Sequence, residues 1–488
     1  MRDGDVRKAS DQQLTFGLSS KRSLGSSPLV ESTFDFEGSK RLTEGVSRPI
    51  SVDLFTGVGG MSLGFEQAGF ESVAAVEIDP IHACAYQFNF PKTTVIPSSI
   101  VGLSARDLRL RTGLGDRTVD VVYGGAPCQG FSMMGQRALD DPRNNLVSEF
   151  VRLVTELRAR RFVFENVRGL TVGAHRLFLE ELIASFDRAG YQVQLPWRVL
   201  NVADYGVPQN RYRLILFGAL KGEKLPEYPP ATSQPADLPE QPGGLVTGPT
   251  CSDALADLPD VDRFGELVAS DSVEIESWGP ASQYGCRLRA EDRGDWGYGY
   301  QRIWDPTRLT SSVRTDHTSI SRRRFQQTRP GEVEPISRFF KLNAKGLANT
   351  LRAGTDSARG AFTSPRPIHY LYPRCISVRE MARLHGFPDW FRFHVTKWHG
   401  ARQIGNAVPP PLAREIASAV MASLGAKPRA PRIQWDLGDP RWLTFDMTAA
   451  ANFFSVPVVI GRRDRKSGAR KRKQTEIVSP HRKFAFYA

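Results

Sequence analysis

The sequence predicts an α/β fold with a doubly wound, mostly parallel sheet, accompanied by a smaller domain that lacks the βαβ pattern. Short apolar runs alternate with helical patterns between residues 49 and 220, which is typical of βαβ units. A glycine-rich turn follows the first of these runs, and acidic residues end the second. The alternation stops near residue 220, where a proline-dense stretch from 225 to 244 begins.

The individual elements follow from the periodicity of apolar residues along the chain. The predicted strands are PISVDL (49–54), ESVAAVEIDP (71–80), TVDVVYGG (118–125), RFVFENV (161–167) and RYRLILFGAL (211–220). The predicted helices are MSLGFEQAGF (61–70), IHACAYQFNF (81–90), NNLVSEFVRLVTELRAR (144–160), SVREMARLHGF (377–387) and PPPLAREIASAVMASL (409–424).

The changes of texture along the chain divide it into five parts. Residues 1–48 are polar and without periodicity, which predicts a flexible leader. We expect a main domain at 49–220, a smaller arginine-rich region with a proline-rich linker at 221–370, and a return to the main domain at 371–424. Residues 425–488 form a C-terminal extension, and its segment 461–473 carries eight basic residues and one acid. This basic segment is either a solvated tail or a nucleic-acid contact.

Composition limits the classes of function. The longest apolar runs fall far short of the roughly 20 residues that a membrane helix needs, and the N-terminus has no apolar core like that of a signal peptide. Five scattered cysteines without a CxxC pair indicate a reducing compartment and no metal site, so we expect a cytoplasmic protein. The 65 basic and 52 acidic residues give a net charge of +13, which favours polyanionic partners such as nucleic acid, although a merely basic protein would look the same.

The first glycine-rich turn and the second strand suggest a nucleoside-containing cofactor. DLFTGVGG, residues 53–60, places three glycines between a strand and a helix, where the backbone can approach a ligand closely. Glu77 and Asp79 follow the second strand, and a carboxylate there can accept hydrogen bonds from ribose hydroxyls. An exposed acidic strand end is the structural alternative.

Three further motifs carry reactive groups toward the same sheet edge. GGAPCQGFS (124–132) holds Cys128 after a strand, ENV (165–167) places Glu165 after the next, and QNRYR (209–213) puts Arg211 and Arg213 on one face of a strand. A thiolate beside a carboxylate suits covalent addition coupled to proton transfer. Taken singly, these residues could equally be an inert thiol, a capping glutamate and surface arginines.

Together, these motifs strongly resemble the bacterial DNA (cytosine-5) methyltransferases that use S-adenosylmethionine, which have a class I, Rossmann-like fold. The motifs occur in the family's usual order as DLFTGVGG, VEIDP, GGAPCQGFS, FENVRGL, QNRYRLILFG and RQIGNAVPPPLAREIA. The segment SVREMARLHGFPDWFRF also resembles the family segment that precedes the last of these motifs. The resemblance covers residues 50–220 and 340–424.

The resemblance implies the chemistry of DNA (cytosine-5-)-methyltransferase. The Cys128 thiolate would add to carbon 6 of a cytosine flipped out of double-stranded DNA, which activates carbon 5 for methylation. Glu165 would hold the ring nitrogen and exocyclic amine, Arg213 would contact the base carbonyl, and Arg211 would support the loop. A thiol of ordinary pKa near 8.5 is only a few per cent ionised at neutral pH, so its surroundings must assist. No metal is needed.

The resemblance also implies the residues that hold S-adenosylmethionine. Glu77 would bind the ribose and Ile78 would pack on the adenine, while Asn406 and Val408 would close the methionine side. The other expected cofactor residues are Asp53, Phe55, Gly57 and Gly59. Where the family often has an aspartate near a GDI sequence, this chain reads PSSI, so Ser99 would take its place, which puts the adenine contacts in doubt.

The region from 221 to 370 stands where the family carries its target-recognition domain. Arginine is the commonest reader of guanine, and it also binds phosphates. The candidate DNA contacts are Arg314, Arg322, Arg323, Arg324 and Arg329 in this region, and Gln129 and Ser132 in the loop of Cys128.

The expected protein is a monomer that modifies a specific DNA sequence as part of a restriction or phage-defence system, with a cognate endonuclease as a candidate partner. A tRNA cytosine-5 methyltransferase is one alternative, but those relatives carry a shorter region between the motifs. A non-catalytic DNA-binding regulator is the other, but it would not need a thiol in the base pocket.

Overall fold

The computed structural model describes residues 48–127, 145–173, 175–239, 242–354 and 366–458. A compact unit begins at Arg48. The predicted leader up to residue 47 and the basic segment 461–473 lie outside the described residues. In the described part of the chain, no helix combines the length and the apolar character needed to cross a membrane.

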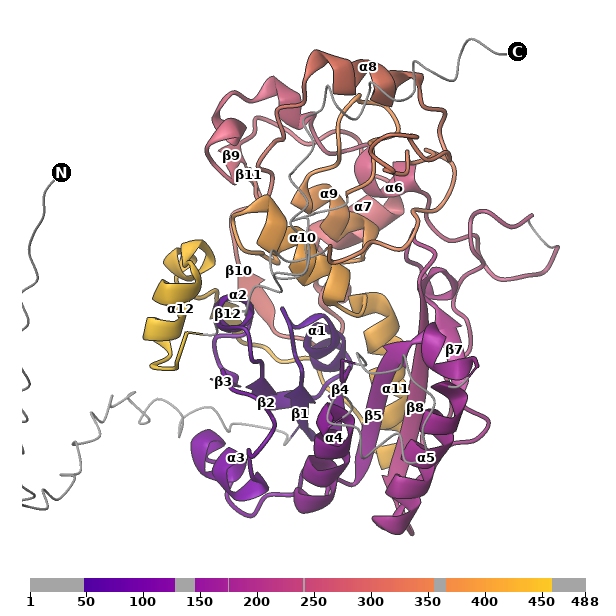
Figure 1. Ribbon diagram of the computed structural model, residues 1–488, viewed down its shortest axis with the longest axis vertical. Helices are drawn as coiled ribbons and strands as arrows, with labels where there is room; N and C mark the ends of the chain where they lie inside the picture. The colour runs from indigo at the N-terminus through magenta and orange to yellow at the C-terminus, as the bar shows by residue number, and fades with distance from the viewer. Residues whose placement is uncertain (1–47, 128–144, 174, 240–241, 355–365, 459–488) are drawn as a thin grey trace, which may run out of the picture. The chain divides into compact units, whose positions relative to one another are not determined.

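The core of this unit is an eight-stranded sheet in the order β3-β2-β1-β4-β5-β8-β6, with β7 paired to β8 (Figure 1). The strands β1 to β5 are parallel neighbours, and β8 runs antiparallel to β5, β6 and β7. The strands are β1 (Ile50–Leu54), β2 (Glu71–Val76), β3 (Thr94–Ile96), β4 (Val121–Gly124), β5 (Arg161–Val167), β6 (Tyr191–Val193), β7 (Arg198–Asn201) and β8 (Tyr212–Leu220).

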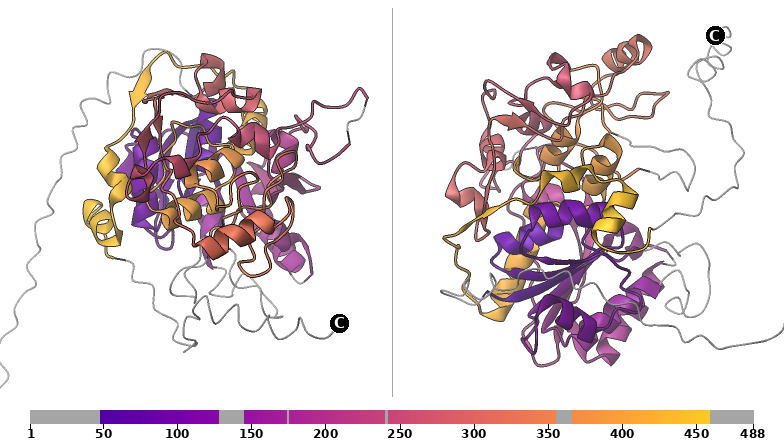
Figure 2. Two further views of the ribbon diagram at one scale, coloured as in Figure 1. Left: turned by 90° about the horizontal axis from the view of Figure 1, so that it is seen from above. Right: turned by 90° about the vertical axis from the view of Figure 1, so that its left-hand side faces the viewer.

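Helices cover both faces of the sheet (Figure 2). They are α1 (Gly60–Gln67), α2 (Pro80–Asn89), α3 (Ala105–Thr112), α4 (Asn145–Glu156), α5 (His175–Arg188) and, from the end of the chain, α11 (Pro410–Leu424). One apolar cluster joins α3, α4 and α5 to the sheet through Phe162 and Phe164, and a second joins α1 and α11 to it through Val163. Alternate residues of β5 therefore serve opposite faces, as the period of two requires. The predicted doubly wound, mostly parallel fold is confirmed.

The chain beyond residue 220 builds short elements beside the strand ends of the sheet. These are α6 (Cys251–Leu255), α7 (Gln283–Arg289), α8 (Ser319–Gln327), α9 (Val378–Leu384), α10 (Lys397–Asn406) and α12 (Met447–Phe453), with β9 (Val273–Glu274), β10 (Gln301–Ile303), β11 (Arg308–Leu309) and β12 (Gln434–Asp436). Two-stranded ladders join β9 to β11 and β10 to β12.

Local chemistry explains where the best-predicted helices begin. Asp79 accepts hydrogen bonds from the amides of Ile81 and His82 and is followed by Pro80, so α2 starts there. Ser377 and Glu380 form a reciprocal capping box at the start of α9. The predicted strands and helices are found with boundaries shifted by a few residues, whereas α3, α5, β3, β6 and β7 were not predicted.

Candidate active site

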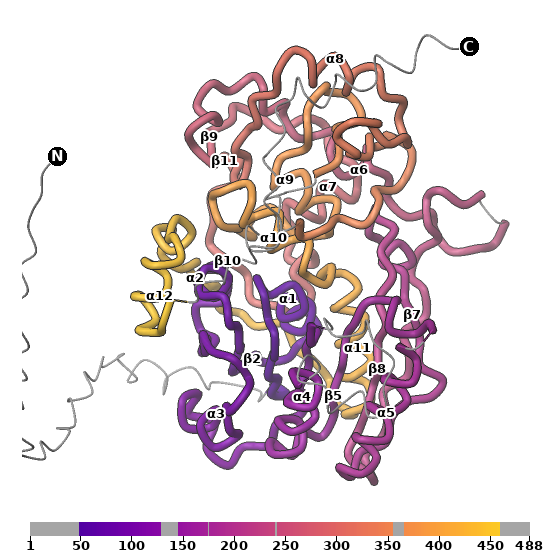
Figure 3. Tube along the Cα trace, in the orientation of Figure 1, coloured from indigo at the N-terminus to yellow at the C-terminus, as the bar shows by residue number. Residues whose placement is uncertain are grey.

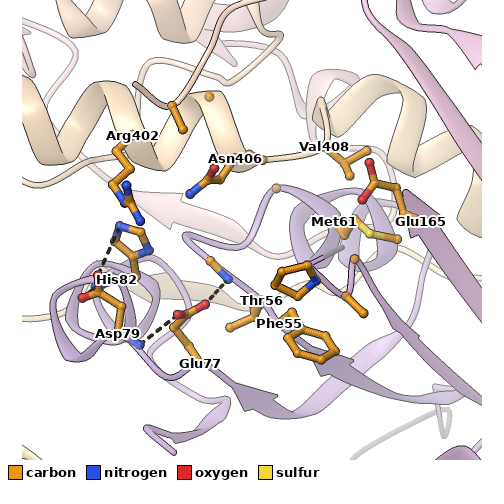
Figure 4. A pocket seen from close by; sticks show the side chains of 18 of the residues that line it. Phe55, Thr56, Met61, Glu77, Asp79, His82, Glu165, Arg402, Asn406 and Val408 are labelled. Atoms are coloured by element: carbon orange, nitrogen blue, oxygen red, sulfur yellow. Dashed lines mark hydrogen bonds and ion pairs between the residues drawn. The ribbon is translucent and has the colours of Figure 1, made fainter. Parts of the chain in front are cut away.

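A cavity of about 750 Å³ lies at the carboxyl ends of the parallel strands, where ligands bind in doubly wound sheets (Figure 4). Its floor comes from the segments that follow β1, β2, β3, β4 and β5, and its opposite wall comes from residues 350–353 and 405–408. Most predicted site residues line it, namely Asp53, Phe55, Gly57, Glu77, Ile78, Ser99, Glu165, Arg211, Arg213, Asn406 and Val408. The sequence motifs therefore converge on one site.

The turn after β1 is tightly constrained. Phe55, Gly57 and Gly59 have positive φ angles of 65°, 57° and 97°. A Cβ atom on Gly59 would lie 2.5 Å from the Phe90 ring, so only glycine fits there. Gly59 does not itself line the cavity, and its role is to let α1 start against α2.

Asp53 holds this turn from beneath. Its buried carboxylate accepts hydrogen bonds from the hydroxyls of Thr56 at 2.9 Å and Ser62 at 2.5 Å. Burial raises its pKa to about 7, and the two hydroxyls oppose that rise. Asp53 thus ties the strand to the helix that follows the turn.

Glu77 is fixed with its carboxylate toward the cavity. One oxygen accepts the amide of Gly57 at 2.7 Å, and the other accepts the amide of Asp79 at 2.9 Å. Burial raises the pKa of Glu77, while His82 and the two amides favour the charged form. A carboxylate held in this way keeps lone pairs for two vicinal hydroxyls, which is the chemistry that a ribose presents.

An apolar surface adjoins Glu77 in the cavity. Ile78 is 54% exposed although it lines a concave site, so a flat apolar ligand group would find a contact surface there. Ser99 also lines the cavity, and its hydroxyl accepts the amide of Val101 at 3.1 Å. A serine hydroxyl can still donate one hydrogen bond from this position.

At the other end of the cavity, Glu165 and Arg213 form an ion pair. The Arg213 Nε lies 2.7 Å from Glu165 Oε1, and each side chain is 12% exposed. Glu165 is paired with Ile215 and Val167 with Arg213 in the β5–β8 ladder, so the two charged residues are diagonal neighbours on one face. The antiparallel direction of β8 therefore brings Arg213 to the carboxyl end of β5.

The segment after β4 is held beside this pair. The Asn166 side-chain amide donates to the Ala126 carbonyl at 3.0 Å, and a Cβ atom on Gly125 would lie 2.4 Å from Glu165 Oε2. The chain thus passes close to Glu165 at Gly125, and Pro127 also lines the cavity. Cys128, Gln129 and Ser132 lie outside the described residues.

Arg211 lines the cavity, but its side chain is buried and hydrogen-bonded to the backbone of the cavity wall. Its guanidinium donates to the carbonyls of Leu351, Gly405 and Ala407 at 2.8–2.9 Å. Burial and the neighbouring Arg213 lower its pKa well below the usual arginine range. Arg211 therefore fastens the 350–353 segment and the GNAV turn together.

The wall opposite Glu77 carries Asn406 and Val408 (Figure 4). A Cβ atom on Gly405 would lie 2.3 Å from the backbone nitrogen of Ala353, which shows how closely the two segments of this wall pack. Further lining residues were not predicted as site residues, including His82, Thr350, Leu351, Arg352, Arg402 and Met447. Arg402 stands in the quoted RQIGNAV motif, but no sequence signal marked Met447.

The candidate DNA arginines differ in what holds them. Arg322 pairs with Asp262 at 2.7 Å, Arg314 donates to the Asp262 carbonyl at 3.1 Å, and Arg324 lies 3.6 Å from Glu334. Arg323 and Arg329 are exposed, and neither forms an ion pair with the residues that the structure describes. Across the same residues, no group of three or more His, Cys, Asp or Glu side chains is arranged to hold a metal ion.

Known proteins resemble this chain over most of its length. The family model "C-5 cytosine-specific DNA methylase" matches residues 50–422. The type II methyltransferase M.XorII of Xanthomonas oryzae is 52% identical over 89% of this chain and its own whole length, and M1.HphI of Haemophilus parahaemolyticus is 34% identical over 76% of this chain and 86% of its own.

A solved structure agrees with these matches. It is an Escherichia coli protein, assigned as a DNA modification methyltransferase encoded within a prophage, which is 31% identical with a TM-score of 0.60 and covers 78% of this chain and all of its own. The predicted class I methyltransferase fold is confirmed. The chain belongs to the C-5 cytosine-specific DNA methylase family and is a DNA (cytosine-5) methyltransferase.

Proposed function

We propose that the protein transfers a methyl group from S-adenosylmethionine to carbon 5 of a cytosine flipped out of a specific double-stranded DNA sequence, through a covalent adduct with Cys128. The observation that carries this proposal is the Glu165–Arg213 ion pair, which lies in the cavity beside the segment leading to Cys128. The Glu165 and Arg213 side chains could not reach a base that is stacked in a duplex, so the cytosine must leave the helix.

The cofactor supplies an electrophilic methyl group on a positively charged sulfur. Glu77 would accept hydrogen bonds from its ribose hydroxyls, and Ile78 and Phe55 would contact the adenine, with Ser99 at the edge of the ring. Asp53, Gly57 and Gly59 would shape the turn, and Asn406 and Val408 would line the methionine side. The dimensions of the cavity suit one drug-sized ligand together with a base.

The protein's own groups would carry the base chemistry. The Cys128 thiolate would form a bond to carbon 6, and the electron pair released toward carbon 5 would form the new bond to the methyl carbon. The bond between that carbon and the cofactor sulfur would break, and the sulfur would leave as a neutral thioether. Glu165 would hold the ring nitrogen and the exocyclic amine while charge develops, and Arg213 would orient Glu165 and contact the base carbonyl. Loss of the carbon 5 proton to a base would then expel the thiolate and restore the ring.

The biological setting is also a proposal. M.XorII and M1.HphI are named type II methyltransferases, which supports a role in a restriction or phage-defence system with a cognate endonuclease. We propose that the enzyme acts as a cytoplasmic monomer, that residues 221–370 select the DNA sequence, and that Arg323 and Arg329 are the arginines most available to DNA. Arg314, Arg322 and Arg324 would act after exchanging their present partners, and Gln129 and Ser132 would contact DNA from the loop of Cys128.

Two experiments test the proposal. The first measures transfer of tritiated methyl groups to duplex DNA by the wild type and by Cys128→Ala, which should be inactive while still binding S-adenosylmethionine. Unchanged transfer by this variant would rule out the covalent mechanism. The second is bisulfite sequencing of DNA from an expressing host, which reports both activity and recognised sequence. Transfer to tRNA alone, or DNA binding without any transfer, would favour one of the alternatives.

A further inference from the structure

The C-terminal extension returns to the cofactor cavity, although neither the sequence motifs nor the family model reaches that far. The family match ends at residue 422, yet Met447 lines the same cavity as Glu77 and Ile78. We propose that residues 434–454, here called the strap, form an outer wall of the cofactor site and that Met447 contacts the bound cofactor. This inference rests on the proposed use of S-adenosylmethionine.

The first half of the strap is fastened to two parts of the protein. β12 pairs in parallel with β10, and Trp435 stacks on Tyr300 with ring centroids 3.6 Å apart. The chain then crosses α2, where the Gly438 amide donates to the Phe88 carbonyl at 2.8 Å. A Cβ atom on Gly438 would lie 2.8 Å from the Phe88 Cα, so the strap backbone runs directly against α2.

The second half of the strap docks α12 along α2 (Figures 1 and 3). Ile81 and Cys84 of α2 are buried together with Ala450. The aromatic and apolar strap residues packed around them are Trp442, Phe445, Met447 and Phe454. Two hydrogen bonds fix the approach, from the Val395 amide to the Leu443 carbonyl at 3.0 Å and between His394 Nε2 and the Phe445 carbonyl at 3.0 Å.

These contacts place Met447 at the cavity beside the start of α2. Met447 is the first residue of α12, it is half-buried, and it packs against the cluster that contains Ile81. Asp79 and His82, from the same end of α2, also line the cavity. An unbranched thioether adapts its shape to the face of an aromatic or sugar ring, so methionine suits a ligand-facing position. The exposed part of the Met447 side chain is therefore available to contact a ligand in the cavity.

Burial of α12 against α2 would be expected of a purely stabilising strap as well. Stabilisation of the fold and contact with the cofactor can be distinguished at Met447, because replacing a residue that only stabilises the fold changes the unfolding temperature and leaves cofactor affinity unchanged. Thr448, the next residue, is exposed and is not among the residues that line the cavity, so it provides a control on the same turn.

The test measures the affinity of the full-length protein for S-adenosylmethionine by calorimetry in the absence of DNA. Because partial loss of an apolar contact weakens binding modestly, Met447→Ala should raise Kd about 5- to 10-fold, while Thr448→Ala should leave it unchanged. Met447→Leu, which keeps the apolar bulk, should restore most of the affinity. In methyl-transfer assays Met447→Ala should raise KM for the cofactor and leave kcat at saturation within about twofold.

A measurement on the unaltered protein guards against a variant that fails to fold. Addition of S-adenosylmethionine should slow amide hydrogen exchange in residues 447–454. An unchanged Kd for Met447→Ala, or unchanged exchange in the strap while Glu77 becomes protected, would overturn the inference and leave the proposed function standing. Absence of any cofactor binding by the wild type would instead refute the proposed function itself.

Discussion

Substitution of Gly125 by alanine should disable the enzyme through Glu165 without altering any group that reacts. The new Cβ atom would lie 2.4 Å from Glu165 Oε2. The oxygen would have to retreat by about 0.6–1.0 Å to reach the 3.0–3.4 Å at which such contacts begin to be tolerated. Gly125 does not have a positive φ angle, so the backbone itself accepts alanine.

The size of the effect follows from that displacement. A misplacement of about 1 Å in a catalytic constellation costs on the order of 100-fold in rate, which corresponds to about 2.7 kcal/mol in the activation free energy. The clash falls on the far end of a flexible side chain rather than on backbone, so we expect the free energy of unfolding to fall by only about 1 kcal/mol. Gly125→Ala should therefore lose most of its activity while it keeps most of its stability.

The assay compares kcat for methyl transfer to duplex DNA with the thermal unfolding midpoint. Gly169→Ala is the matched control, because its Cβ atom would meet nothing closer than Val167 Cγ2 at 3.9 Å. In a Glu165→Gln background, Gly125→Ala should add little further loss, since both changes act on the same carboxylate. Wild-type kcat in Gly125→Ala, or full additivity with Glu165→Gln, would refute the reasoning.

Four further outcomes are expected. Glu77→Gln should weaken S-adenosylmethionine binding about 10- to 100-fold by calorimetry, because a charged hydrogen-bond acceptor held by two amides is lost; equal affinity would contradict the ribose assignment. Arg211→Met should lower the thermal unfolding midpoint markedly, since the buried carbonyls of Leu351 and Gly405 lose their donor and the Ala407 carbonyl loses one of its two partners, and an unchanged midpoint would show that water replaces it. Burial opposes ionisation of Glu380, but Arg374 at 2.9 Å lowers its pKa to about 2. The stability that Glu380 contributes is therefore complete above pH 4.5 and lost as the pH falls toward 2, so the difference in unfolding free energy between wild type and Glu380→Gln should shrink on acidification. Deletion of residues 461–488 should flatten the dependence of DNA affinity on salt if the basic segment binds phosphates, and an identical slope would show that it does not.

The sheet and the motif residues were predictable because strong local signals coincide there. Buried strands such as ISVDL and RFVFENV are mostly apolar, and polar residues near their carboxyl ends, Asp53 and Glu165, line the cavity. Parallel topology then brings those ends together, so the sequence order of the motifs was sufficient to place Glu77 and Glu165 at one cavity.

The arrangement of β8 was less accessible to sequence reasoning. Alternation along QNRYR predicted Arg211 and Arg213 on one face, and both line the cavity, but the period of two does not reveal which one is buried. Arg211 is buried because carbonyls of residues 351, 405 and 407 surround it, and those contacts span at least 140 positions of the chain. The antiparallel pairing of β8 with β5 is likewise a long-range property.

The strap was missed for a related reason. Residues 434–454 contain short segments with aromatic side chains but no extended period, and α12 has only seven residues. Its helix is stabilised by packing on α2 rather than by its own propensity. The short elements of the 251–327 region escaped prediction in the same way.

The packing of α11 on α1 has a consequence for how the enzyme is made. A Cβ atom on Gly64 of α1 would lie 2.4 Å from that of Ala413, so the first helix of the chain packs directly against α11, one of its last helices. Residues 350–353, 405–408 and 447 complete the cavity wall as well. A nascent chain must therefore leave the ribosome almost entirely before the cavity is complete, and contacts of such long separation form slowly. Truncated translation products should consequently not methylate the host genome at all, rather than methylate it partially.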